Sequence, residues 1–199
     1  EFGGLPAWLL EEDLRIRSSA PAFIEAVDRY YDRLLGLLTP YQMDRGGPIL
    51  MMQVENEYGS YGEDKDYLRA IRDLMKEKGV TCPLFTSDGP WRATLRTGTL
   101  IEEDLFVTGN FGSKAAYNFG QMKEFFNEYG KKWPLMCMEF WDGWFTRWKE
   151  PVIQRGPEEL AAAVHEVLEP GSITLYMIHG GTNFGCMNGC SVRGTLDLP

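Results

Sequence analysis

The sequence lacks any apolar run as long as the roughly 20 residues that a membrane-spanning helix needs. No signal peptide is recognisable within it, and it opens on Glu1 rather than Met, so we expect it to be part of a longer protein. Its basic residues are scattered and its net charge is −9, whereas a nucleic-acid-binding surface needs clustered Lys and Arg. We predict no membrane span in this chain and no nucleic-acid partner. The compartment and the oligomeric state stay open.

Residues that bind metals are scarce, with two His and four Cys in the chain. Cys186 and Cys190 lie four residues apart in a glycine-rich loop, but this spacing matches no zinc site and lacks His partners. A disulfide between them is left open. Cys82 and Cys137 fall in or beside apolar runs, where small buried thiols are expected. We therefore predict no metal and no cofactor.

Glycine motifs that bind nucleotides are also missing. No G-x-G-x-x-G follows an apolar run. The loop Gly180–Gly185 lacks the Lys-Ser/Thr pair of a P-loop, and no helix start follows it. A lone His179 before this loop is weak evidence for a site. The first absence favours a barrel over a doubly wound sheet, and the second leads us to discount a phosphate-binding loop.

What is present is an alternation of apolar strands with amphipathic helices. The first expected strand begins at Pro48, and the other four cover residues 83–86, 105–108, 134–139 and 172–178. The expected helices run from Pro21, after a serine cap, to near Pro40, and over about residues 64–78, 115–129 and 158–168. Such alternation predicts right-handed βαβ units and an α/β fold with a parallel sheet.

All five expected strands carry polar or glycine-rich residues at their carboxyl ends. A barrel and a doubly wound sheet both place their sites there. Functional-looking residues on several strand ends, rather than in one crevice, favour the barrel. A (β/α)8 TIM barrel needs about 250 residues, so the chain is expected to hold about strands 4 to 8. We predict that residues 1–199 form part of one such domain.

Two strand ends carry a glutamate among aromatic residues, Glu57 and Glu139. Glycoside hydrolysis needs two carboxyl groups, one protonated and one ionised, on either side of the scissile bond. Asn56 offers an amide for a sugar hydroxyl, but strand alternation would point it away from Glu57, so a kink or bulge is required there. Retention of configuration would place the two carboxyl groups roughly 5–5.5 Å apart, and inversion about 6.5–9.5 Å.

Each of these residues could instead have a purely structural role. A single glutamate after a strand is commonly a solvated loop residue or a structural ion pair. Glu55 has the same strand parity as Glu57, and we expect it to be a structural partner. Asp88 and Asp142 each precede a glycine, where Asp is frequent for backbone reasons alone. The rings of Trp141 and Trp144 could form a sugar-stacking wall or plug the rim, and Tyr176 lies in an apolar run that suggests the core.

Four segments together resemble the family 35 glycoside hydrolases, the β-galactosidases of the Asn-Glu superfamily. They are EFGGLPAWLL at the start, QVENEYGSYG over Gln53–Gly62, EFWDGW over Glu139–Trp144, and GGTNF over Gly180–Phe184. They occur in the family's order and span nearly the whole chain. The resemblance implies a (β/α)8 barrel that removes terminal β-linked galactose with retention, through a covalent galactosyl-enzyme.

By this resemblance, Glu57 is the general acid/base on the fourth strand and Glu139 is the nucleophile on the seventh. Asn56 is expected to hold the sugar, Trp144 and Tyr176 to line the galactose pocket, and Trp141 to lie at its variable rim. The family has further barrel segments upstream and β-domains downstream, so we expect the isolated chain to be inactive. A non-catalytic carbohydrate-binding remnant, or a superfamily hydrolase acting on glucosides or mannosides, is the alternative. Linkage and aglycone preference stay open.

Overall fold

The computed structural model describes residues 5–10, 14–146, 149–177, 191–193 and 195–197. A five-stranded sheet forms its centre, with the strands in the order β1-β2-β3-β4-β5 and every neighbouring pair parallel. The strands are β1 (Met52–Gln53), β2 (Leu84–Asp88), β3 (Phe106–Phe111), β4 (Met136–Phe140) and β5 (Ser172–Ile173). Strands that pair in chain order belong to a barrel, because a doubly wound sheet reverses its order. The chain thus forms the curled parallel half of an incomplete (β/α) barrel.

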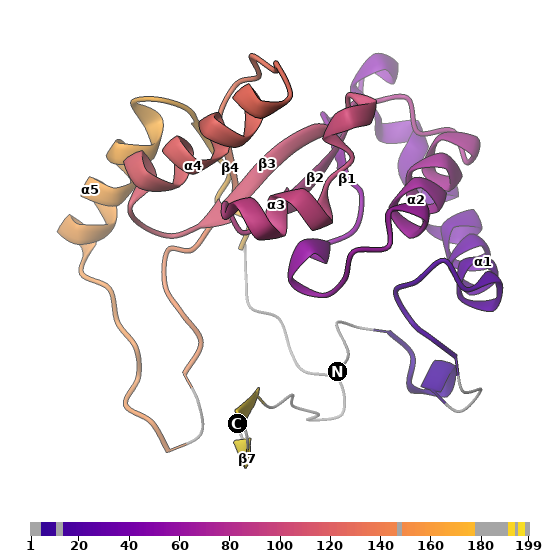
Figure 1. The fold of residues 1–199 in the computed structure, drawn as a ribbon, viewed down its shortest axis with the longest axis horizontal. Helices are drawn as coiled ribbons and strands as arrows, with labels where there is room; N and C mark the ends of the chain where they lie inside the picture. The colour runs from indigo at the N-terminus through magenta and orange to yellow at the C-terminus, as the bar shows by residue number, and fades with distance from the viewer. Residues whose placement is uncertain (1–4, 11–13, 147–148, 178–190, 194, 198–199) are drawn as a thin grey trace.

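Helices connect these strands and cover the sheet (Figure 1). They are α1 (Pro21–Leu38), α2 (Lys65–Glu77), α3 (Arg92–Gly98), α4 (Ala115–Glu128) and α5 (Pro157–Leu168). The predictions of α1, α2, α4 and α5 are confirmed. The seven-residue α3 was not predicted, because it is too short to show a helical period. No helix in the described ranges is long and apolar enough to cross a membrane.

The ends of α2 show how the sequence sets a helix boundary. The side chain of Asp64 caps its first turn by accepting a hydrogen bond from the Tyr67 amide at 3.0 Å. Gly79 follows with a φ of 92°, a left-handed conformation that glycine adopts at little cost. The serine cap predicted for α1 is wrong: its cap residue is Ala20, which has no side-chain donor or acceptor, and Pro21 occupies the first turn.

Two of the expected strands are shorter than predicted. In the run from Pro48 only β1 pairs as a strand, while Ile49 forms an isolated bridge with Gln42. After β5 the backbone from Thr174 to Met177 has no strand pairing. A small antiparallel pair, β6 (Ser191–Arg193) with β7 (Thr195–Asp197), was not predicted. The expected strand end at Ile178, the loop with His179, and Cys186 and Cys190 lie outside the described residues.

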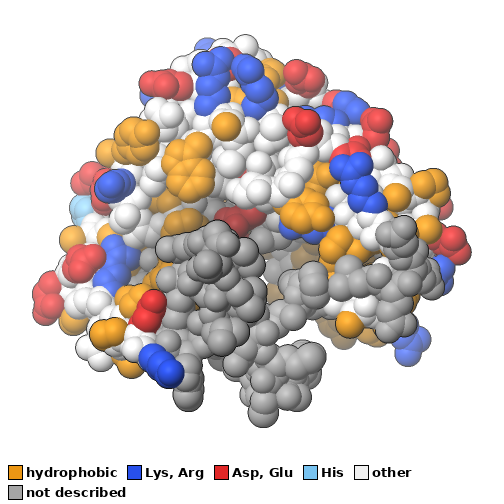
Figure 2. Space-filling view, turned by 60° about the horizontal axis from the view of Figure 1, so that its bottom comes forward, with side chains coloured by type: hydrophobic (Ala, Val, Ile, Leu, Met, Phe, Trp, Pro, Cys, Tyr) orange, Lys and Arg blue, Asp and Glu red, His pale blue; other side chains and the backbone are white. Residues whose placement is uncertain are grey.

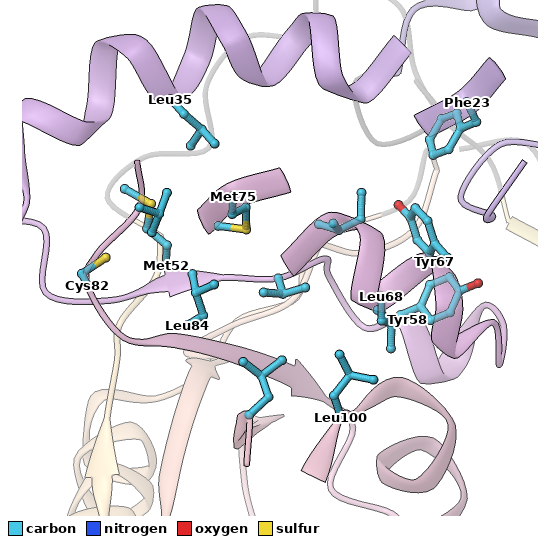
Figure 3. Packing of buried hydrophobic residues seen from close by; sticks show 14 of the residues in the cluster. Phe23, Leu35, Met52, Tyr58, Tyr67, Leu68, Met75, Cys82, Leu84 and Leu100 are labelled. Carbon is cyan, nitrogen blue, oxygen red and sulfur yellow. The ribbon is translucent and has the colours of Figure 1, made fainter. Parts of the chain in front are cut away.

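The core consists of two clusters on the helical side of the sheet. The first joins α1 and α2 to β1 and β2, and Figure 3 shows Leu35, Met52, Leu68, Met75 and Leu84 packed within it. The second joins α3, α4 and α5 to β3 and β4. Both clusters pack the helices against the sheet and so hold the ends of its strands in place. Cys82 and Cys137 are buried in these clusters, as predicted.

Candidate active site

The carboxyl ends of the strands carry four polar residues, of which Glu57, Asn110 and Glu139 are joined by hydrogen bonds, while the Asp88 side chain lies against Gly98 of α3. Glu57 follows β1, Asp88 ends β2, Asn110 lies near the end of β3, and Glu139 near the end of β4. Figure 2 turns the lower side of Figure 1 toward the viewer and shows acidic atoms deep in a recess between hydrophobic side chains. This is the sheet end where barrels place their sites.

The backbone kinks immediately after β1, as the sequence required for Asn56 and Glu57 to share a site. Glu55 has a φ of 60° and Glu57 a φ of 48°, both in the left-handed region that residues with a Cβ rarely occupy. The Glu57 amide donates to the Ser87 carbonyl at 3.0 Å, which ties the kink to β2. Such conformations persist only where the surroundings enforce them, and they concentrate at functional sites.

Glu139 reaches the same region through an irregularity in the sheet. The pairing of β3 with β4 passes from Gly109–Cys137 to Asn110–Glu139, so the register shifts by one residue. A bulge of this kind re-aims the side chains that follow it. The shift sets Glu139 directly opposite Asn110, which the sequence had not identified as a site residue.

The side chain of Asn110 connects the two glutamates. It is fully buried, and its Nδ2 donates to Glu57 Oε1 at 3.1 Å. Its Oδ1 accepts from the Glu139 amide at 3.2 Å and also from the Ser87 hydroxyl. One amide group therefore fixes the distance between a side chain after β1 and the backbone of β4.

The protonation of Glu139 depends on its neighbour. Burial raises the pKa of Glu139, and the negative charge of Glu57 raises that pKa further. Hydrogen bonds from the side chains of Trp141 and Asn110 act in the opposite direction, since they stabilise the ionised carboxylate. Glu139 therefore ionises less readily while Glu57 is negatively charged.

Glu55 is a structural partner, as expected, and does not join this pair. Arg17 forms a bidentate ion pair with Glu55, in which Nε donates to Oε1 at 2.9 Å and Nη2 donates to Oε2 at 2.8 Å. The Tyr67 hydroxyl and the Asn56 amide donate to the same carboxylate, at 2.8 Å and 2.6 Å. Its side chain is only 9% exposed. These contacts satisfy Glu55 completely and fix the strained segment just before Glu57.

Asn56 lies at the surface of this segment, with its side chain oriented from one side. Gln53 Nε2 donates to Asn56 Oδ1 at 3.0 Å, so the amide nitrogen of Asn56 points away from Gln53. Arg17 Nη2 also donates to the Asn56 carbonyl at 2.7 Å. An exposed amide held in one orientation is suited to bind a hydroxyl group.

The three predicted aromatic residues lie on the same side of the sheet. The side chain of Trp141 lies near Glu139 and acts to lower the pKa of that carboxyl group, and its ring meets Trp144 edge-on at 5.4 Å between centroids. Trp144 is 53% exposed and lines a groove of about 520 Å³ with Trp141. Tyr176 is half-exposed instead of lying in the core. Its pKa is raised by partial burial and by the charges of Glu139, Asp142 and Glu57.

The two competing aspartates have different environments. Asp88 is 1% exposed and accepts a hydrogen bond from the Gly59 amide at 2.7 Å. Asp142 is exposed in the loop after β4. Within the described part of the chain, no group of three or more His, Cys, Asp or Glu side chains could hold a metal ion.

A parallel barrel sheet with two glutamates and aromatic rings at its strand ends is the arrangement expected of a glycoside hydrolase. Comparison with known proteins makes the class more specific: the chain belongs to the family described as "Glycosyl hydrolases family 35", whose model matches residues 1–198. It is 41% identical over 192 residues to "Beta-galactosidase-1-like protein 2" of Homo sapiens, covering 95% of this chain and 29% of that protein. It is 38% identical over 196 residues to "Beta-galactosidase 17" of Arabidopsis thaliana, covering 96% and 28%. The chain thus spans less than a third of the length of these relatives.

Proposed function

We propose that this chain is the catalytic part of a retaining exo-β-galactosidase that removes terminal β-linked galactose from oligosaccharides or glycoconjugates. The observation that supports this best is the Asn110 bridge, because it holds Glu57 and Glu139 together at the strand ends. Family membership and relatives named as β-galactosidases favour galactose as the sugar.

In this proposal Glu139 attacks the anomeric carbon and Glu57 protonates the departing oxygen. The C–O bond to the leaving group breaks as the bond from Glu139 to galactose forms. Glu57, now ionised, takes a proton from water, and that water releases galactose with its original configuration. When Glu57 holds the proton, its charge no longer opposes ionisation of Glu139, and the bonds from Asn110 and Trp141 favour the carboxylate that must attack.

The remaining predicted residues would bind the sugar. Asn56 would hold a ring hydroxyl, as the resemblance suggests for the 2-hydroxyl, through the amide that Gln53 orients. Tyr176 would contact galactose beside the two carboxyl groups, and Trp144 would stack on an apolar sugar face. Trp141 would bind at the rim while it holds Glu139.

The roles of the carboxyl groups are tested in the natural-length protein that contains this chain. Glu139→Gln should reduce turnover of a nitrophenyl β-galactoside by at least about 1,000-fold, because a neutral amide cannot form the glycosyl-enzyme. Glu158→Gln, an exposed carboxyl at the start of α5, serves as the matched control and should retain full activity. Near-normal turnover by Glu139→Gln would contradict the nucleophile assignment.

A panel of nitrophenyl glycosides tests the sugar. Galactoside should be hydrolysed in preference to glucoside and mannoside, and proton NMR of the first product should show the β-anomer. Preference for another sugar would place the protein elsewhere in the superfamily. The isolated 199 residues should hydrolyse galactosides poorly, because β1 and β5 are edge strands of the described sheet.

A further inference from the structure

Asp88 is a buried carboxyl group that the proposed reaction does not use. It ends β2, is 1% exposed, and accepts one hydrogen bond, from the Gly59 amide to Oδ1 at 2.7 Å. Its second oxygen, Oδ2, is buried with no hydrogen-bond partner among the described residues. A buried carboxyl group with an unsatisfied oxygen is costly, so it persists where it serves the structure or the chemistry nearby.

The turn that Asp88 holds is the one that begins at Glu57. Glu57 has φ 48° and ψ 39° and leads directly into the short turn Tyr58–Ser60. Gly59 is clamped within this turn, because its amide donates to Asp88 and its carbonyl accepts from the Thr97 hydroxyl at 3.1 Å. The left-handed backbone at Glu57 is therefore fixed from both sides, by Ser87 through the Glu57 amide and by Asp88 through Gly59.

The helix α3 packs closely against this carboxyl group. A Cβ on Gly98, at the end of α3, would lie 2.3 Å from Asp88 Oδ1 and 2.4 Å from Oδ2. A Cβ on Gly59 would lie 2.0 Å from the Thr94 carbonyl oxygen. Two glycines thus allow α3 and the turn to close onto Asp88. Removing the Asp88 side chain would therefore leave the turn without the group that holds the Gly59 amide.

We propose that Asp88 is a positioning residue for Glu57: by holding the Gly59 amide, it fixes the backbone that aims Glu57 at the leaving-group oxygen. The proposal rests on the acid/base role proposed for Glu57. Asp88 acts through the turn and does not touch the substrate. The charged groups that face it are Glu57 and Glu55 from the segment after β1 and Lys65 from α2.

Leaving-group dependence separates this role from a general loss of structure. Phenyl β-galactoside needs protonation by Glu57 as its C–O bond breaks, whereas 2,4-dinitrophenyl β-galactoside leaves without it. In the natural-length protein, Asp88→Ala should lower kcat/KM for the phenyl substrate by about 10-fold or more, but by less than about 3-fold for the dinitrophenyl substrate. Asp88→Asn keeps an oxygen acceptor for the Gly59 amide and should restore most of the phenyl activity.

Thr86→Val is the matched control, because Thr86 lies in the same strand and its buried hydroxyl has no described hydrogen-bond partner. This variant should leave the ratio of the two kcat/KM values unchanged. Equal losses on both substrates in Asp88→Ala, or failure of Asp88→Asn to restore the ratio, would overturn the positioning role. A wild-type protein that hydrolyses neither galactoside would contradict the proposed function itself, and the inference with it.

Discussion

Asn110 Nδ2 donates a hydrogen bond to Glu57 Oε1 across 3.1 Å, although 53 residues separate the two in the chain. Glu57 follows β1 and Asn110 lies in β3, so the bond crosses over the end of β2. The other polar atom of the same amide, Oδ1, holds the Glu139 amide. Any change in the Asn110 side chain therefore alters the hydrogen bonding of both Glu57 and Glu139.

We predict that Asn110→Ala lowers kcat by about 10- to 100-fold on a nitrophenyl β-galactoside, because small displacements of reacting groups have large kinetic effects. Asn118→Ala is the control: it removes another buried amide, whose Nδ2 donates to the Ser113 carbonyl at 2.8 Å, without touching either carboxyl group. Steady-state kinetics and urea unfolding of both variants check this. Equal kinetic losses in the two would show that Asn110 acts only through stability.

Much of the architecture is predictable from sequence because it depends on local periodicity. The helices α2 and α4 have apolar residues at helical spacing and end near glycines with positive φ, and both were found where expected. The kink before Glu57 was also predictable, since strand alternation forbids Asn56 and Glu57 from sharing a face. Local rules sufficed for these features.

The connections within the site were not predictable, because they depend on contacts between distant segments. Asp88 and Asp142 have the same local pattern, an aspartate before a glycine at a strand end. The structure buries the first beneath α3 and exposes the second. The role of Asn110 likewise requires the register shift between β3 and β4, which no property of either strand alone reveals.

The ion pair of Arg17 with Glu55 yields a prediction about stability. Arg17→Leu should lower the free energy of unfolding by about 3 kcal/mol, because it leaves the Glu55 carboxylate largely buried without its counter-charge. Arg29→Leu is the control, since Arg29 and Glu25 are both exposed and such pairs contribute about 0–1 kcal/mol. Urea denaturation measures both. Similar small losses would mean that Tyr67 and the Asn56 amide alone satisfy Glu55.

Two helical glycines should respond in opposite directions to alanine. Gly120 in α4 has open space where a Cβ would be, so Gly120→Ala should stabilise the protein by about 0.5–1 kcal/mol. Gly98→Ala would force a Cβ against the Asp88 carboxyl group and should destabilise it by about 1–3 kcal/mol. Unfolding midpoints compare the two. A stabilising Gly98→Ala would show that α3 can move away from Asp88.

The buried carboxyl group of Asp88 makes stability depend on pH. Burial raises the pKa of Asp88 from 3.8 to about 7, and the charge of Glu57 adds to this, although the Gly59 amide and Lys65 oppose it. Between these values the folded protein keeps a proton that the unfolded chain has lost, so this contribution to stability falls as pH rises, by up to about 1.4 kcal/mol per pH unit. Asp88→Asn is neutral at every pH. It should therefore be more stable than wild type at pH 8, by on the order of 2–4 kcal/mol, and nearly equal to it at pH 4.

Urea unfolding of the two proteins at pH 4, 6 and 8 checks this prediction, with Asp142→Asn as the control. Asp142 is exposed, so its neutralisation should change stability by less than about 0.5 kcal/mol at each pH. A difference between wild type and Asp88→Asn that stays constant from pH 4 to pH 8 would show that Asp88 is already ionised when buried. The outcome would also show how firmly Asp88 holds the turn that begins at Glu57. An ionised Asp88 binds the Gly59 amide with a charge-assisted hydrogen bond, whereas a protonated Asp88 binds it with a weaker, neutral one.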